Sequence, residues 1–133
     1  MTPKKTKILN ELGSAYVHPE KGPRHTLMCF GYPDDGWFEI LKELFVQLNT
    51  MELPKDFEII QVKEKFAGLR VYTNGVSEKV NKLIESACQK ASTTCEMCGE
   101  PGREQQVNGW YKTLCEKCLK IRKERRTWKI QKS

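Results

Sequence analysis

Apolar residues recur with helical spacing in two stretches of this 133-residue chain. The first stretch repeats at i, i+3, i+4, i+7, i+8 and i+11, through Trp37, Ile40, Leu41, Leu44, Phe45 and Leu48. The second has the same spacing, over Val80, Leu83, Ile84, Ala87, Cys88 and Ala91. Each pattern places one apolar stripe along a helix, so the sequence predicts two amphipathic helices. We expect Asp34 or Asp35 to cap the first helix and Ser77 to cap the second.

Two stretches between these helices have the composition of β-strands. Residues 57–66 and 69–73 are rich in β-branched and aromatic side chains, and Ala67-Gly68 joins them. We expect Gly68 to supply the positive φ that a tight turn requires. Two helices over a small antiparallel hairpin predict an α+β domain over residues 26–92.

The amino-terminal segment lacks a regular apolar pattern. Pro19, Gly22 and Pro23 interrupt it, so we expect residues 1–25 to form an irregular arm. The segment has no apolar run typical of a signal peptide, and no stretch of the chain approaches the ~20 apolar residues that span a bilayer. The 38% of apolar and 30% of charged residues are typical of a folded soluble protein. These features predict a cytoplasmic protein without a membrane partner.

Four cysteines in two close pairs carry the clearest chemistry of the chain. Cys95 and Cys98 form one Cys-x-x-Cys pair, Cys115 and Cys118 form the other, and sixteen residues separate the pairs. This spacing lets four thiolates close on one tetrahedral ion, and zinc suits such a soft, redox-inert site. The alternatives are two disulfides or four unrelated thiols, which the paired spacing disfavours. The sequence therefore predicts one structural Zn²⁺ ion.

The residues around the cysteines predict the fold of this module, which we place at residues 93–127. Gly99 suits a sharp knuckle turn after the first pair, and Asn108-Gly109 is a strong hairpin signal. The run from Glu116 to Arg126 contains no Gly or Pro, which favours a helix. Knuckle, hairpin and helix in this order predict a treble-clef-like zinc finger with four cysteine ligands. A zinc ribbon, with a second hairpin in place of the helix, is the alternative.

Four stretches of the sequence resemble a known group of proteins. They read DGW at 35–37, QVKEKFAGLRVY at 61–72, STTCEMCGEPG at 92–102 and GWYKTLC at 109–115. In this combination the chain resembles a family of small uncharacterised proteins from bacteriophages, prophages and some bacteria. The family usually has Gly where this chain has Ala67. The resemblance implies a phage or prophage setting and a structural zinc, and it carries no known activity.

The sequence disfavours enzymatic chemistry at the cysteine site. An HNH-type nuclease needs a histidine on the hairpin of the finger, and residues 105–114 contain none. Both histidines, His18 and His25, lie far away in the sequence. A deaminase needs an open zinc position, which a fourth thiolate closes. We therefore predict a non-enzymatic protein with no small-molecule substrate.

The basic charge of the chain is concentrated at its end. Residues 117–133 carry eight cations and one acid, a charge of +7, while the rest of the chain carries −1. Such a patch attracts phosphate backbones. The predicted binding residues lie in the last helix and in a basic tail at 128–133: Lys120, Arg122, Lys123, Arg125, Arg126, Trp128 and Lys129.

Two kinds of partner fit this composition. The leading hypothesis is non-specific binding to nucleic acid. The alternative is a phage protein that binds and inhibits or redirects a host protein or defence system. Trp110 and Tyr111 could lie in a core or form an exposed stacking platform. A smaller basic group, Lys63, Lys65 and Arg70, is interpreted as a solvent-facing strand surface.

Overall fold

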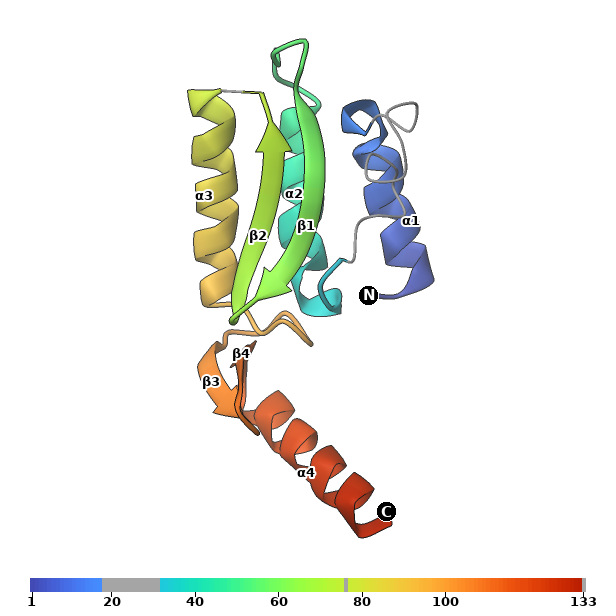
Figure 1. The fold of residues 1–133 in the computed structure, drawn as a ribbon, viewed down its shortest axis with the longest axis vertical. Coiled ribbons are helices and arrows are strands. Elements are labelled where there is room, and N and C mark those ends of the chain that lie inside the picture. Colours follow the sequence, from blue (N-terminus) through green and yellow to red (C-terminus); the bar gives the residue numbers. More distant parts are fainter. Residues whose placement is uncertain (18–31, 76, 133) are drawn as a thin grey trace.

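The computed structural model describes the backbone of residues 1–17, 32–75 and 77–132, and the side chains of these residues as far as Glu124. Helices and two antiparallel hairpins form two parts, stacked end to end (Figure 1). We call residues 1–92 the body and residues 93–132 the cysteine module. The elements of the body are α1 (Pro3–Leu12), α2 (Phe38–Leu48), β1 (Glu58–Lys65), β2 (Gly68–Asn74) and α3 (Glu78–Ser92). Those of the module are β3 (Arg103–Val107), β4 (Trp110–Leu114) and α4 (Glu116–Lys132).

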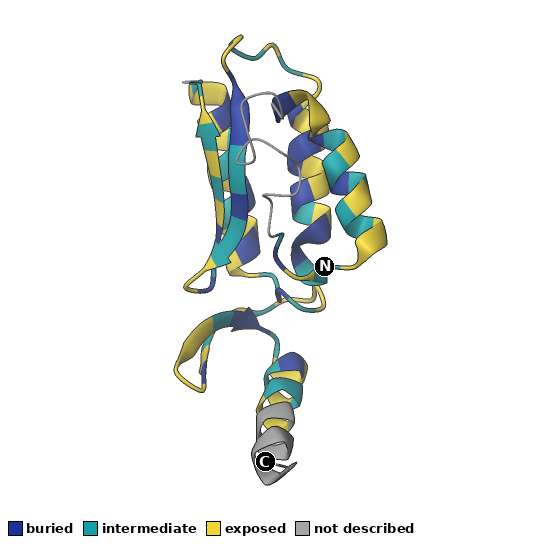
Figure 2. Cartoon of the chain, turned by 45° about the vertical axis from the view of Figure 1, so that its right-hand side comes forward, coloured by how far each residue is buried: buried dark blue, intermediate teal, exposed yellow. Residues whose placement is uncertain are grey.

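Both predicted amphipathic helices are confirmed. Trp37 and the stripe residues Leu41, Leu44, Phe45 and Leu48 of α2 are buried, and so are Val80, Ala87 and Ala91 on α3. The other stripe residues, Ile40, Leu83, Ile84 and Cys88, are partly buried against the same core. The helices pack in a series, with α1 on α2, α2 on α3, and α3 on β2 (Figure 1). Their buried residues face inward and form one core with the hairpin (Figure 2). Ser77 caps α3 as predicted, since its Oγ accepts from the Val80 N–H at 3.4 Å.

The prediction of an irregular amino-terminal arm was wrong for residues 3–12, which form α1. Thr2 caps this helix by accepting from the Lys5 N–H, and Pro3 occupies its first turn, where a missing N–H has no cost. Leu9 is fully buried in the core. The breakers at positions 19–23 that suggested an irregular arm lie beyond the helix, outside the described residues.

The predicted caps of α2 were also wrong. No side chain caps α2, and Asp34 makes no capping hydrogen bond. Asp35 Oδ1 instead accepts from the Thr2 N–H at 2.8 Å, and its Oδ2 lies 3.7 Å from Lys5 Nζ. The reason is the helix that the prediction missed: α1 brings its own N–H and ammonium groups to this carboxylate.

The first hairpin has the predicted strands but a different turn chemistry. Lys65 pairs with Gly68 across the last rung, so the two-residue turn consists of Phe66 and Ala67. Their φ angles are 51° and 64°, while Gly68 has no positive φ, which corrects the expectation for that glycine. Gly68 is instead the first residue of β2, where the strand needs extended backbone. In the second hairpin the turn residues are Asn108 (φ 55°) and Gly109 (φ 85°), as predicted.

Helix α4 continues through the boundary that we expected between finger and tail. Its backbone is helical to Lys132, so the predicted basic tail at 128–133 belongs largely to the helix. The helix leaves the cysteine module and points away from the body (Figures 1 and 2). Among the described residues, no helix combines the length and apolar character needed to cross a membrane.

Candidate metal centre

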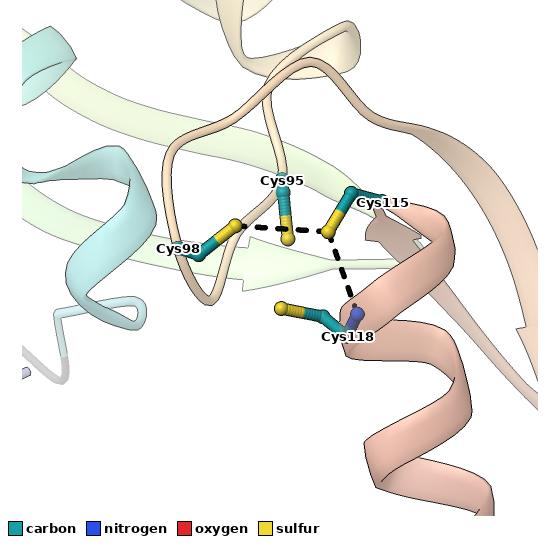
Figure 3. Close-up of side chains that lie close together, drawn as sticks. All are labelled: Cys95, Cys98, Cys115 and Cys118. Atoms are coloured by element: carbon teal, nitrogen blue, oxygen red, sulfur yellow. Dashed lines mark hydrogen bonds between the residues drawn. The ribbon is translucent and has the colours of Figure 1, made fainter.

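The first cysteine pair lies in a knuckle directly after α3. The Gly99 N–H donates to the Cys95 carbonyl at 2.9 Å, and the Cys95 N–H donates to the Glu100 carbonyl at 2.7 Å. Gly99 has a φ of 84°, which explains why a glycine follows the second cysteine of the pair. The closed turn brings the Sγ atoms of Cys95 and Cys98 toward a common centre (Figure 3).

The second pair lies at the start of α4. Cys115 directly precedes the helix, and Cys118 lies in its first turn. The Cys118 N–H donates to Cys115 Sγ at 3.4 Å, so this thiol occupies the position of a capping side chain. This hydrogen bond lowers the pKa of Cys115 to about 7, whereas burial raises the pKa of Cys118. A bound cation favours the thiolate form of both.

The four cysteines meet in one place, as the sequence predicts. Their Sγ atoms all lie within 4.8 Å of one another, and those of Cys98 and Cys115 are 3.7 Å apart (Figure 3). A tetrahedral ion with metal–sulfur bonds of about 2.3 Å separates its ligands by about 3.8 Å. All four are free thiols rather than disulfides. The residues present therefore fit a site that could hold one metal ion.

Few apolar side chains surround this site. Its buried cluster consists of Cys95, Cys118, Val107 and Leu114, so two of the four members belong to the cysteine site itself. An ion pair at the surface, between Arg103 and Glu116 at 3.0 Å, links β3 to α4.

The cysteine module packs closely on the body through a glycine that sequence reasoning missed. The Gly36 N–H donates to the Glu96 carbonyl at 2.9 Å, and a Cβ at position 36 would lie 2.0 Å from the Cys95 carbonyl oxygen. No other residue fits there without moving the knuckle. Trp37 Nε1 donates to the Thr94 carbonyl at 2.8 Å. The Asp-Gly-Trp run at 35–37, one of the stretches on which the predicted resemblance rests, was the sequence signal available for this contact.

A partly buried charge cluster, in which only Glu96 is fully buried, forms a second link between the two parts. Lys112 Nζ on β4 lies 3.1 Å from Glu64 Oε2 on β1 and 3.6 Å from Glu96 Oε1 in the knuckle. Burial raises the pKa of Glu96, and the nearby Lys112 ammonium opposes that effect. Next to it, Thr113 Oγ1 donates to the Ala67 carbonyl at 2.7 Å. These contacts hold the module against the turn of the first hairpin.

The predicted binding residues are only partly within the described side chains. Lys120 and Lys123 are exposed on α4, while Arg122 is half-buried, with its Nη1 3.9 Å from Met97 Sδ. Arg125, Arg126, Trp128 and Lys129 lie on the helical backbone of α4, but their side chains fall outside the described residues, as do His18, His25 and Cys29. Trp110 and Tyr111 are exposed, at 70% and 46%.

Fold and site together define a class: an α+β body joined to a small module with a four-cysteine site. No protein-family model, curated protein or solved structure matches the chain significantly. The resemblance to the phage and prophage family therefore stays a prediction from sequence.

Proposed function

We propose that this chain is a non-enzymatic, zinc-stapled module that binds nucleic acid through α4. Four thiolates fill the coordination shell of one Zn²⁺ ion and leave no open position for a substrate, which favours a structural metal. The order of knuckle, hairpin and helix supports a treble-clef-like finger. A reducing cytoplasm, that of a bacterial host if the chain is phage-encoded, would keep the thiols available.

The observation that carries the proposal is the position of α4. The helix begins at the cysteine site and extends away from the body, so a large partner can approach it without contacting the body (Figure 1). Lys117, Lys120 and Lys123 are exposed and three residues apart, which places them on one face of the helix. The sequence continues the helix with four more cations. A rod of this charge fits a phosphate backbone and reads no base sequence.

Titration of labelled oligonucleotides with the zinc-loaded chain tests this proposal. Fluorescence anisotropy over a series of salt concentrations should give a Kd that rises steeply with salt, because neutralised phosphates release counterions. The double variant Lys120→Gln, Lys123→Gln should weaken binding about 10-fold or more and flatten the salt dependence. The matched control, Lys79→Gln with Lys82→Gln on α3, removes the same charge from another surface. Salt-insensitive binding, or equal loss in both variants, would contradict the proposal.

The metal itself is tested on the purified chain. Elemental analysis should find one zinc per chain, and replacement of Cys98 by serine should reduce that content. The variant Cys88→Ser provides the control, because Cys88 lies away from the site and its thiol donates to the Leu69 carbonyl at 3.1 Å. An iron or copper content equal to the chain concentration would overturn the zinc assignment.

A second candidate function is binding to a host protein. The exposed rings of Trp110 and Tyr111 at the tip of the second hairpin favour it, because aromatic side chains are enriched in protein interfaces. A pull-down from bacterial lysate, with and without nuclease, separates the two functions. A single protein recovered in near-equal amount after nuclease treatment would favour the second, whereas material lost on nuclease treatment favours the first.

A further inference from the structure

In the turn of the first hairpin, Phe66 has a backbone conformation that bulky residues disfavour. Both hairpins of this protein use two-residue turns with positive φ at both positions. The second has Asn108-Gly109, the pair that such a turn prefers. The first has Phe66 and Ala67, and a bulky L-residue in this region costs about 1–2 kcal/mol. The ring of Phe66 is 67% exposed, so burial in the body does not offset this cost.

The strained turn is also held in place. The Ala67 N–H donates to Glu64 Oε1 at 3.2 Å, and the Ala67 carbonyl accepts from Thr113 Oγ1 at 2.7 Å. Glu64 is in turn bound by Lys112. Contacts from the cysteine module therefore support the turn at Ala67, next to the exposed Phe66. Strain kept at an exposed, well-supported residue is typical of functional surfaces.

The strand face beside Phe66 is basic. Strand alternation and register place Lys63, Lys65, Arg70 and Tyr72 on the face opposite the buried Val62. Lys63 Nζ lies 5.5 Å from the centroid of the Tyr72 ring, which is 43% exposed.

One cation of this face also lies over the ring of the turn. Lys65 Nζ lies 5.6 Å from the centroid of the Phe66 ring, and Lys63 and Arg70 are paired across the strands between the two rings. Within the described part of the chain, none of these three cations forms an ion pair. Within the described residues, the face therefore carries three cations without an ion pair, with an exposed aromatic residue at each end.

We propose that this face of the first hairpin binds single-stranded nucleic acid, with bases stacked on Phe66 and Tyr72 and phosphates paired with Lys63, Lys65 and Arg70. Exposed aromatic faces interleaved with cations are the elements that bind single strands without sequence preference. A duplex keeps its base faces stacked inside and cannot use the rings. The inference rests on the proposed function and deepens it: α4 supplies charge for any strand, and the hairpin selects the unpaired form.

Binding of two labelled probes to the zinc-loaded chain tests the inference. The probes are an oligothymidine and a mixed-sequence DNA duplex, each followed by fluorescence anisotropy. The ring variant Phe66→Asn, Tyr72→Thr should lose about 10-fold or more in affinity for oligothymidine and change by less than about two-fold on the duplex. Asparagine tolerates positive φ, so the variant keeps the turn. Phe66→Tyr, which retains a ring, should bind oligothymidine like the parent chain.

Charge variants provide the matched comparison. Lys63→Gln with Lys65→Gln should weaken oligothymidine binding more than Lys79→Gln with Lys82→Gln on α3, although both remove the same charge.

The outcomes separate the two proposals. If the ring variant binds both probes like the parent chain while Lys120→Gln, Lys123→Gln weakens both, the hairpin inference is overturned and the role of α4 stands. Equal weakening on single strand and duplex also overturns the inference. A parent chain that binds neither probe overturns both. The last outcome comes from a pull-down. If the parent chain recovers a protein after nuclease treatment and the ring variant does not recover it, this face binds a protein. That outcome also overturns the inference.

Discussion

The body and the cysteine module are joined in one chain but are stabilised by different means. In its described residues, the body buries sixteen apolar side chains drawn from three helices, a hairpin and their connections. The module buries four, and two of these are cysteines of the metal site. A core of that size cannot offset the conformational entropy of ordering its own backbone. The contrast teaches that the body folds by hydrophobic burial, whereas the small core of the module leaves its stability to its contact with the body and, if our proposal holds, to a metal bound by its four cysteines.

Metal removal should have the largest effect and is the strongest test of this difference between the body and the module. Structural zinc sites supply apparent binding free energies of about 10–16 kcal/mol, so chelation should unfold the module. In a ¹H–¹⁵N spectrum, the amide signals of residues 95–124 should collapse to unfolded positions, while those of α2 and α3 stay dispersed. The Cys98→Ser variant should give the same result without a chelator.

The control for this experiment is Cys88→Ser, which leaves all four ligands in place and should retain the module signals. A spectrum that is unchanged after complete metal removal would show that the module is stable without an ion. Collapse of the body signals together with those of the module would show that the two parts fold as one unit.

Replacement of Lys112 by methionine tests the junction between the two parts. The change removes the cation between Glu64 and Glu96 and leaves the buried Glu96 carboxylate without its main compensating charge. We expect a loss of about 1–3 kcal/mol in the free energy of unfolding, measured by denaturant titration of the zinc-loaded chain.

A second change should restore most of that stability. In the triple variant Lys112→Met, Glu64→Gln, Glu96→Gln, no unpaired charge remains, so the loss should fall below that of Lys112→Met alone. Lys82→Gln, which removes an exposed cation from α3, should change the free energy of unfolding by less than about 0.5 kcal/mol. Equal losses for Lys112→Met and the triple variant would show that the lysine acts through packing rather than charge.

The smallest effect is expected when residues are exchanged between the two hairpin turns. Phe66→Asn should stabilise the body by about 0.5–1 kcal/mol, because asparagine tolerates a φ of 51° and the lost ring is mostly exposed. The converse change, Asn108→Phe, should destabilise by a similar amount. Thermal unfolding of the zinc-loaded variants measures both.

The sign of the Phe66→Asn effect links stability to function. A variant that melts at a higher temperature but binds oligothymidine more weakly would show that Phe66 is retained for binding at the expense of stability. If Phe66→Asn destabilises the body, the ring contributes packing that its exposure does not reveal, and the strain argument for this turn fails.

The sequence could predict those features that leave a periodic or paired pattern of residues. The stripes of α2 and α3 and the Cys-x-x-Cys pairs are local signals, because helix geometry and ligand spacing repeat over a few residues. Helix α1 was missed although Thr2 and Pro3 are a good start signal, since the breakers after residue 18 dominated the interpretation. The turn at Phe66 was misassigned because its residues do not prefer the conformation that the strand register imposes.

The sequence by itself determined the two amphipathic helices, the four-cysteine site, and a basic carboxyl-terminal helix. Each of these follows from residue types at short spacings, which local backbone geometry converts directly into a face or a ligand set. Only the tertiary structure decided that the knuckle packs against Gly36 and that Lys112 lies between Glu64 and Glu96. It also decided that Phe66 is exposed in a strained turn. These features depend on residues that are distant in the sequence, and their contacts arise from packing rather than from any repeating pattern.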